Sequence, residues 1–264
     1  MHLGLEDRRV LVTGSTLGIG RASAAHFARE GAHVFVHGRD EARTKKAADA
    51  LRAETGRDTI EAVHGDLSTS EGAARVIAAV PEVDVLVNNA GIFEPKPFTE
   101  ITDADWLRFF ETNVMSGVRL ARHYFPKMLA RNWGRIVFVS SESAIQIPSE
   151  MIHYGTTKTA QLAVSRGLAE LTRGTGVTVN SVLPGPTRSE GVDEFVHALA
   201  VQRGVDDAGM EKLFFAEGRP SSLLQRFATV DEIANLIVYV SSALASATNG
   251  SALRVDGGVA RTIT

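Results

Sequence analysis

The sequence contains no cysteine among its 264 residues, which excludes disulfide bonds and a cysteine nucleophile and fits a reducing compartment. No apolar run reaches membrane-spanning length, and the first residues lack the long apolar core of a signal peptide. Basic residues are not in excess, because the formal charge is −3. We therefore expect a cytoplasmic protein without nucleic-acid or membrane partners.

Metal-ligand clusters, internal repeats and low-complexity linkers are missing as well. The histidines are scattered, and no group of His, Asp and Glu has the spacing of metal ligands, so no metal site is expected. At 44% hydrophobic residues the chain can build a substantial core. These features predict one domain over residues 1–264.

Seven short apolar segments alternate with helical patterns along the chain. They lie at residues 10–12, 32–36, 60–63, 83–87, 134–139, 177–182 and 251–255. Strands that alternate with helices at this rhythm are typical of an α/β fold of the doubly wound, Rossmann type. We expect a sandwich with a central, mostly parallel seven-stranded sheet and helices on both faces.

A glycine-rich turn, residues 13–20, connects the first strand to a helical pattern over 21–30. Gly14, Gly18 and Gly20 permit a tight turn, in which backbone amides and the helix N-terminus can face a pyrophosphate. The turn is not a P-loop, because no Gly-Lys-Ser/Thr follows it. An ordinary strand–helix turn is the alternative interpretation.

The end of the second strand bears on the choice of cofactor. An acid there binds the free ribose hydroxyl of NAD(H), whereas an arginine accommodates the 2′-phosphate of NADP(H). In this chain Gly38 stands where the acid is expected, and Arg39 follows it. This favours NADP(H). Alternatively, Arg39 is a surface residue and Asp40 binds the ribose, which leaves NAD(H) possible.

Tyr154 and Lys158 lie four residues apart in a helical pattern, so they share one helix face. A free tyrosine has a pKa of about 10, and a fixed positive charge nearby lowers it. The phenol could then exchange a proton with an alcohol or a carbonyl. Asn113 interrupts another helical pattern, where it could mark a distortion of the helix.

Together these motifs resemble the short-chain dehydrogenase/reductase family over nearly the whole chain. The resemblance implies a catalytic acid/base at Tyr154, a substrate-binding serine at Ser141 (or Ser140), a lysine at Lys158 that lowers the tyrosine pKa and holds the ribose, and a water-anchoring asparagine at Asn113. It implies that the cofactor contacts Gly14, Ser15, Thr16, Leu17, Gly18, Ile19, Gly20, Arg39, Asp66, Leu67, Asn89, Ala90, Gly91, Tyr154, Lys158, Pro184, Gly185 and Thr187.

The resemblance further implies an NADP(H)-dependent oxidoreductase that transfers hydride between nicotinamide and a carbonyl or secondary alcohol of a small or medium organic substrate. The alternatives are an NAD-dependent sugar or secondary-alcohol dehydrogenase, a 3-oxoacyl reductase, and a non-catalytic dinucleotide-binding regulator. The arginines by which fatty-acid reductases of the family dock their carrier protein are replaced by Asn132 and Thr175, although Arg131, Arg135 and Arg173 lie near. Family members are usually homotetramers or dimers, so a homo-oligomer is expected.

Residues 188–226 break the strand–helix rhythm and match the family's substrate lid. Candidate pocket residues are Phe195, Leu213, Phe214 and Phe215 in the lid, and Ile147, Met151 and His153 before Tyr154. We expect His153 to be a rim or packing residue. Glu142 either meets a polar part of the substrate or, as we favour, points away and pairs with a neighbour. Trp106, Phe109 and Phe110 are expected in the core.

Overall fold

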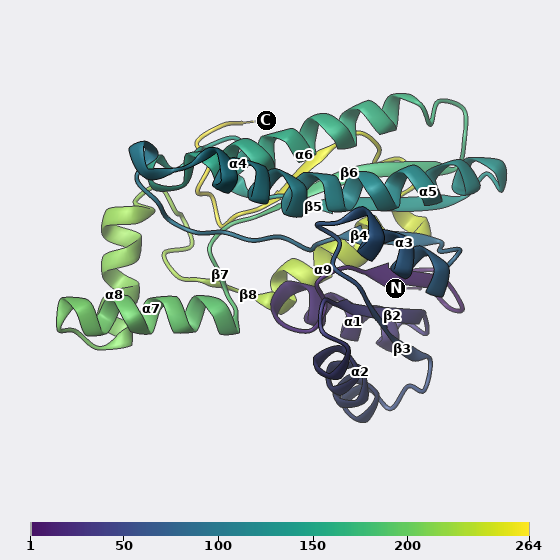
Figure 1. Cartoon of the computed structure of the whole chain (residues 1–264), viewed down its shortest axis with the longest axis horizontal. Helices are drawn as coiled ribbons and strands as arrows, with labels where there is room; N and C mark the ends of the chain where they lie inside the picture. Colours follow the sequence, from purple (N-terminus) through teal and green to yellow (C-terminus); the bar gives the residue numbers. More distant parts are fainter. Residues whose placement is uncertain (1, 264) are drawn as a thin grey trace.

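The computed structural model describes residues 2–263 and contains the expected parallel seven-stranded sheet (Figure 1). The strand order is β3-β2-β1-β4-β5-β6-β9, and each neighbouring pair is parallel. The strands are β1 (Arg9–Val12), β2 (His33–Gly38), β3 (Ile60–His64), β4 (Val85–Asn88), β5 (Gly134–Val139), β6 (Val177–Pro184) and β9 (Ala252–Val255). The prediction of a doubly wound α/β fold is confirmed. From β1 to β3 the strands are added toward one edge of the sheet, and from β4 onwards they are added on the other side of β1, toward the opposite edge.

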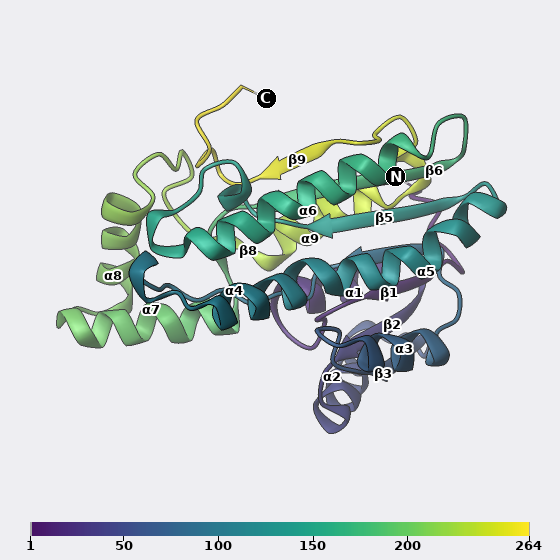
Figure 2. The ribbon, with the colours of Figure 1, turned by 45° about the horizontal axis from the view of Figure 1, so that its top comes forward.

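Helices cover both faces of this sheet. On one face lie α1 (Gly18–Arg29), α2 (Glu41–Thr55) and α9 (Val230–Val240). On the other lie α3 (Ser70–Ala79), α5 (Ser116–Ala130) and α6 (Ile152–Glu170), with α4 (Asp103–Phe110) in line with α5. Figure 2 shows α4, α5 and α6 running along β5 on this second face.

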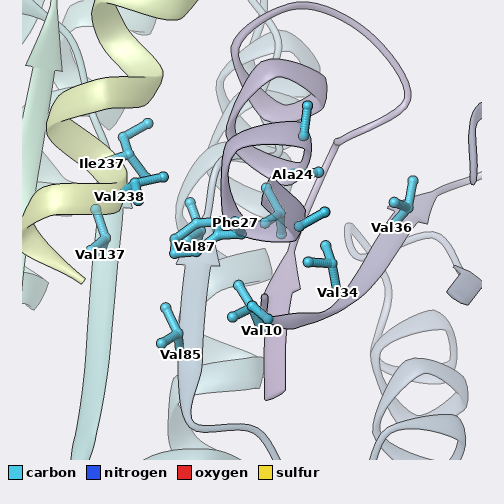
Figure 3. Close-up of a cluster of buried hydrophobic side chains, with 14 of the residues drawn as sticks. Val10, Ala24, Phe27, Val34, Val36, Val85, Val87, Val137, Ile237 and Val238 are labelled. Carbon is cyan, nitrogen blue, oxygen red and sulfur yellow. The ribbon is translucent and has the colours of Figure 1, made fainter. Parts of the chain in front are cut away.

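Two hydrophobic clusters, one on each face, hold the layers together. Val10 and Val12 of β1 belong to the cluster with α1 and α9, whereas Leu11 between them belongs to the opposite cluster with α5. Figure 3 shows the first cluster, where Phe27 of α1 lies near Val10 and Val87. Side chains of a strand point alternately to the two faces, so strands buried on both faces are continuous apolar runs. Each fully buried Val or Leu contributes about 1.5–3 kcal/mol.

A π-helical turn, Glu111–Met115, separates α4 from α5. The distortion expected at Asn113 is therefore present, and Asn113 is buried inside it. Phe109 is fully buried, but the prediction for Phe110 was wrong, because its side chain is 43% exposed. Adjacent helical residues point about 100° apart at 3.6 residues per turn, so the two rings cannot both face the same core.

The segment expected to be a lid, residues 188–226 (hereafter the lid), forms a separate layer at one end of the sheet. It contains the short strand β7 (Thr187–Arg188), α7 (Glu190–Arg203), α8 (Asp207–Leu213) and a π-helical turn at Phe214–Gly218, and it returns through β8 (Ala228–Thr229). In Figure 1, α7 and α8 project beyond the strands. A third hydrophobic cluster holds this segment together, and it consists of Val196, Ala200, Met210, Phe215 and Phe227.

Candidate active site

A cavity of about 380 Å³ opens between the carboxyl ends of the strands and the lid. The crevice outside these strand ends is where open α/β sheets bind ligands. Twelve of the expected site residues line the cavity: Leu17, Gly18, Ile19, Gly20, Asn89, Gly91, Ser141, Tyr154, Lys158, Pro184, Gly185 and Thr187. The glycine turn and the helix that carries Tyr154 and Lys158 are distant in the sequence, but both line this cavity.

The glycine turn requires its glycines for geometric reasons. Gly14 and Gly18 have φ angles of 62° and 57°, in the left-handed region that favours glycine. A Cβ on Gly20 would lie 2.5 Å from both the Asn89 amide nitrogen and the Gly14 carbonyl oxygen. Asn89 itself donates to the carbonyls of Thr13 and Gly14 at 2.9 and 3.1 Å. The end of β4 and the turn after β1 are therefore tied together.

An acidic side chain already occupies part of this turn. The Gly18 amide, at the start of α1, donates to Glu190 Oε2 at 3.0 Å, and Glu190 is the first residue of α7. A helix N-terminus favours anions because its first amides have no partner within the helix. The Glu190 carboxylate shows that this amide is free to bind one. The turn therefore fits the pyrophosphate of a dinucleotide.

His37 has a structural role in the cofactor half of the site that the sequence did not reveal. It is only 2% exposed, accepts from the Gly14 amide through Nδ1 at 3.1 Å, and bonds the Gly65 carbonyl through Nε2 at 3.0 Å. Burial lowers the pKa of His37 to about 4, so the ring is neutral at pH 7. This histidine links the glycine turn to the loop that begins at Gly65. Only its place at a strand end, next to Gly38, hinted at such a role.

The end of β2 has no room for an acid at position 38. A Cβ on Gly38 would lie 2.4 Å from Thr44 Oγ1 and 2.7 Å from a Thr16 methyl carbon. Arg39 is exposed at this edge, beside the cofactor turn. Asp40, the alternative ribose ligand, caps α2 by accepting from the Arg43 amide at 2.7 Å.

Several expected cofactor residues lie outside the cavity wall. Ser15 is fully buried, and its hydroxyl donates to the Val12 carbonyl at 2.7 Å. Asp66 is exposed at the end of β3 and accepts from the Ser68 amide and hydroxyl, which lowers its pKa. Leu67 is buried in the hydrophobic cluster beneath. Gly14, Thr16, Arg39, Ala90 and Asn113 likewise do not line the cavity.

Tyr154, Lys158 and Ser141 line the same cavity. Lys158 Nζ lies 5.6 Å from the centre of the Tyr154 ring and donates to the Val139 carbonyl at 2.9 Å. The Ser141 hydroxyl accepts from the Ser143 amide at 3.1 Å. Ser140 also lines the cavity, but its hydroxyl is engaged, since it donates to the Lys158 carbonyl at 2.9 Å. Ser141 thus remains the serine beside Tyr154.

The expected lowering of the Tyr154 pKa is not found. Burial raises the Tyr154 pKa above its usual value, and the Glu142 carboxylate raises it further, while Ser141 and Arg219 act in the opposite sense. Burial also lowers the pKa of Lys158 to about 8. At neutral pH the phenol is therefore protonated, and Lys158 is mostly an ammonium.

Asn113 holds the loop beyond β4 rather than the tyrosine itself. Its side chain exchanges two hydrogen bonds with the Ile92 backbone, at 2.8 and 3.0 Å, and donates to Thr157 Oγ1 at 3.0 Å. The backbone carbonyl of Asn113 accepts a hydrogen bond from the Gln161 side-chain amide at 2.5 Å. The π-helical turn therefore places Asn113 between the loop at Ile92 and α6.

The end of the cavity that residues 188–226 help to line differs from expectation in several residues. Phe195, Phe214 and Met151 line it, whereas Leu213 and Phe215 pack within the lid and Ile147 is not part of the wall. His153 is fully buried against the Phe109 ring, 4.1 Å between ring centres, and is thus a packing residue.

Glu142 lines this end as well, although we favoured an orientation away from the site. It is 5% exposed, and its pairing partner, Arg219, is itself part of the cavity wall. The carboxylate therefore faces the site and pairs with a neighbour at the same time.

Among residues 2–263 no helix is long and apolar enough to cross a membrane. Within the same residues no group of three or more His, Asp or Glu side chains could hold a metal ion.

Comparison with known proteins identifies the family. A family model described as short chain dehydrogenase matches residues 8–199. The chain therefore belongs to the short-chain dehydrogenase family, and it is an NAD(P)-dependent oxidoreductase acting on CH–OH or C=O groups.

Relatives match over the full length of the chain. The protein named "Uncharacterized oxidoreductase YvaG" of Bacillus subtilis (strain 168) is 46% identical over 263 residues, covering 100% of both chains. The 3-oxoacyl-[acyl-carrier-protein] reductase FabG of Aquifex aeolicus (strain VF5) is 29% identical, covering 98% of this chain and 100% of that protein. The structure of L-sorbose reductase from Gluconobacter frateurii, complexed with NADPH and L-sorbose, superposes with a TM-score of 0.94 at 33% identity and covers 100% of both chains.

Proposed function

We propose that this protein is an NADP(H)-dependent reductase of a ketone or aldehyde group in a small or medium organic substrate. The observation that carries the cofactor assignment is the end of β2. Gly38 has no space for a carboxylate, Asp40 is engaged as a helix cap, and Arg39 is exposed next to the glycine turn. A guanidinium in this place suits a 2′-phosphate. The similar L-sorbose reductase was solved with NADPH.

The catalytic residues can carry out the proton transfer that reduction requires. When bound, the nicotinamide supplies the hydride that adds to the carbonyl carbon. The raised pKa keeps Tyr154 protonated, so the phenol can donate its proton to the carbonyl oxygen. Ser141 donates a hydrogen bond to the same oxygen as negative charge develops there. Lys158, charged below about pH 8, stabilises the phenolate that proton donation leaves behind.

Two of the three arginines near the expected docking positions do not support the 3-oxoacyl alternative, a carrier-protein substrate, and only Arg173 is exposed without such an engagement. Arg135 is 2% exposed and donates to three backbone carbonyls, and Arg131 lies 3.7 Å from Asp84. Asn132 accepts from the Gly176 amide at 2.8 Å instead of facing a partner. We therefore place the substrate among free small molecules. We also propose a homo-oligomer of dimer or tetramer size, on the resemblance to the family.

Titration of the purified protein with NADPH and, separately, with NADH tests the cofactor assignment by nicotinamide fluorescence. We expect NADPH to bind more tightly, and Arg39→Ala to weaken NADPH binding about ten- to a hundredfold while leaving NADH nearly unchanged, because one charge-assisted bond contributes about 1.5–3 kcal/mol. Arg122→Ala, at an exposed arginine of α5, is the matched control. Equal binding of both cofactors would refute the assignment to NADP(H) and favour the NAD-dependent dehydrogenase.

Consumption of NADPH in the presence of a ketone and aldehyde panel tests the reaction. Turnover of panel members supports the reductase. Cofactor binding without turnover of any of them would favour the non-catalytic regulator.

A further inference from the structure

A buried carboxylate lies beside the reacting centre, and the hydride chemistry does not require it. Glu142 directly follows Ser141 and lines the cavity with Tyr154. Glu142 is 5% exposed, and its Oε2 accepts a hydrogen bond from the Ser141 hydroxyl at 2.5 Å. A carboxylate is costly to bury unless hydrogen bonds and charges compensate it.

The lid supplies the compensating charge. Arg219 Nε lies 3.5 Å from Glu142 Oε1, and Arg219 Nη1 lies 3.1 Å from Glu150 Oε1. The Arg219 side chain is 11% exposed, whereas that of Glu150 is 49% exposed. Arg219 thus gives the buried Glu142 side chain a cationic partner. Because this arginine already serves two carboxylates, it is not free to bind an anionic substrate.

Ser141 cannot serve Glu142 and the substrate at once. A serine hydroxyl can donate only one hydrogen bond, and Ser141 donates it to Glu142. The Ser141 oxygen at the same time accepts a hydrogen bond from the Ser143 amide. To donate to a substrate carbonyl, the hydroxyl must turn away from Glu142. That movement leaves a buried carboxylate oxygen without its donor, which weakens binding of the substrate.

We propose that Glu142 accepts a hydrogen bond from a substrate hydroxyl on the carbon next to the reacting carbonyl, so that the site selects α-hydroxy ketones. The substrate hydroxyl replaces the Ser141 proton on Oε2, and Ser141 is released to bind the carbonyl oxygen. Glu142 Oε2 lies 2.5 Å from Ser141 Oγ, and a substrate carbonyl oxygen bound to Ser141 would lie one further hydrogen bond away. The carbonyl oxygen is then within about 5 Å of the carboxylate, a span that a hydroxyl on the neighbouring carbon can bridge. This inference rests on the proposed reductase function and names its substrate class.

Matched ketone pairs, one with a hydroxyl and one with a methyl group next to the carbonyl, provide the test. For the purified protein with NADPH, kcat/KM is measured for hydroxyacetone against 2-butanone and for acetoin against 3-methyl-2-butanone. We expect the hydroxy ketone to be preferred by at least about tenfold, because the analogue leaves a buried polar group unpaired. Glu142→Gln should reduce the preference, and Glu142→Leu should bring the ratio of kcat/KM within each pair close to unity.

Glu150→Gln is the matched control, since it removes the other acid paired with Arg219 at the exposed rim. Its preference for hydroxy ketones should equal that of the unaltered protein. Equal rates within each pair would overturn the inference but leave the reductase function standing. A parallel loss with both pair members in the Glu142 variants would also overturn it, because Glu142 would then only position Ser141. Failure to reduce any ketone or aldehyde of the wider panel would overturn the reductase function itself, and this inference with it.

Discussion

Acidification should destabilise the fold through His37. The ring is neutral in the folded chain, where it joins the Gly14 amide to the Gly65 carbonyl, and burial lowers its pKa from 6.5 to about 4. Between these two values the unfolded chain holds a proton that the folded chain does not. Stability therefore rises with pH through this window and falls on acidification from about 6.5 to 4.

The size of the effect follows from the shift. Each pKa unit corresponds to about 1.4 kcal/mol, so complete acidification across the window removes about 3 kcal/mol from the free energy of unfolding. This is a large fraction of the 5–15 kcal/mol that is roughly typical of a folded protein. Protonation of Nδ1 would remove the acceptor of the Gly14 amide, whereas Nε2 would still donate to the Gly65 carbonyl. The glycine turn should therefore loosen together with the fold.

Urea denaturation at a series of pH values from 7.5 to about 4.5 measures this dependence. His37→Asn retains an acceptor for the Gly14 amide but does not titrate. We expect this variant to be less stable at pH 7.5, with a flatter decline towards acid than the unaltered chain shows. His197→Gln, at a largely exposed histidine of the lid, should leave the decline unchanged. Parallel pH curves for the unaltered chain and His37→Asn would refute the assignment of the acid sensitivity to His37.

Three further predictions concern the site. Tyr154→Phe should abolish turnover yet bind NADPH normally in a fluorescence titration, because only the proton donor is lost; wild-type rates in the variant would contradict this role. Glu190→Gln should tighten NADPH binding a few-fold, since an exposed carboxylate at the Gly18 amide repels and competes with the pyrophosphate; unchanged binding would show that Glu190 does not compete. Gly20→Ala should lower the free energy of unfolding by about 1–3 kcal/mol in urea denaturation, because its Cβ would lie 2.5 Å from the Gly14 carbonyl; undiminished stability would mean that the turn can shift.

The sequence predicted the seven strands and the gathering of the motifs because both follow from local patterns. Apolar runs identify strands buried on both faces, and the carboxyl ends of parallel strands meet at one edge of the sheet. Gly18, Ser141 and Tyr154 therefore line one cavity although they are far apart in the chain.

The orientation of Glu142 could not be predicted in the same way. It depends on Arg219, which lies in the lid 77 positions later, and no local pattern relates the two residues. The Tyr154 pKa is a second case, because burial and Glu142 together outweigh the effect expected of a nearby positive charge. Phe110 is a third case: its aromatic side chain is of a type that is common in cores, but it points toward the exposed side of the helix.

The hydrophobic cluster of the lid has a consequence for how such a protein can diverge. This cluster shares no residue with the two clusters that flank the sheet. Substitutions between Glu190 and Phe227 can therefore remodel the substrate wall while the stability of the sheet is little affected. We therefore expect that this segment can be exchanged between relatives to alter the cavity wall, provided that Glu142 and Arg219 are exchanged together so that their ion pair is kept.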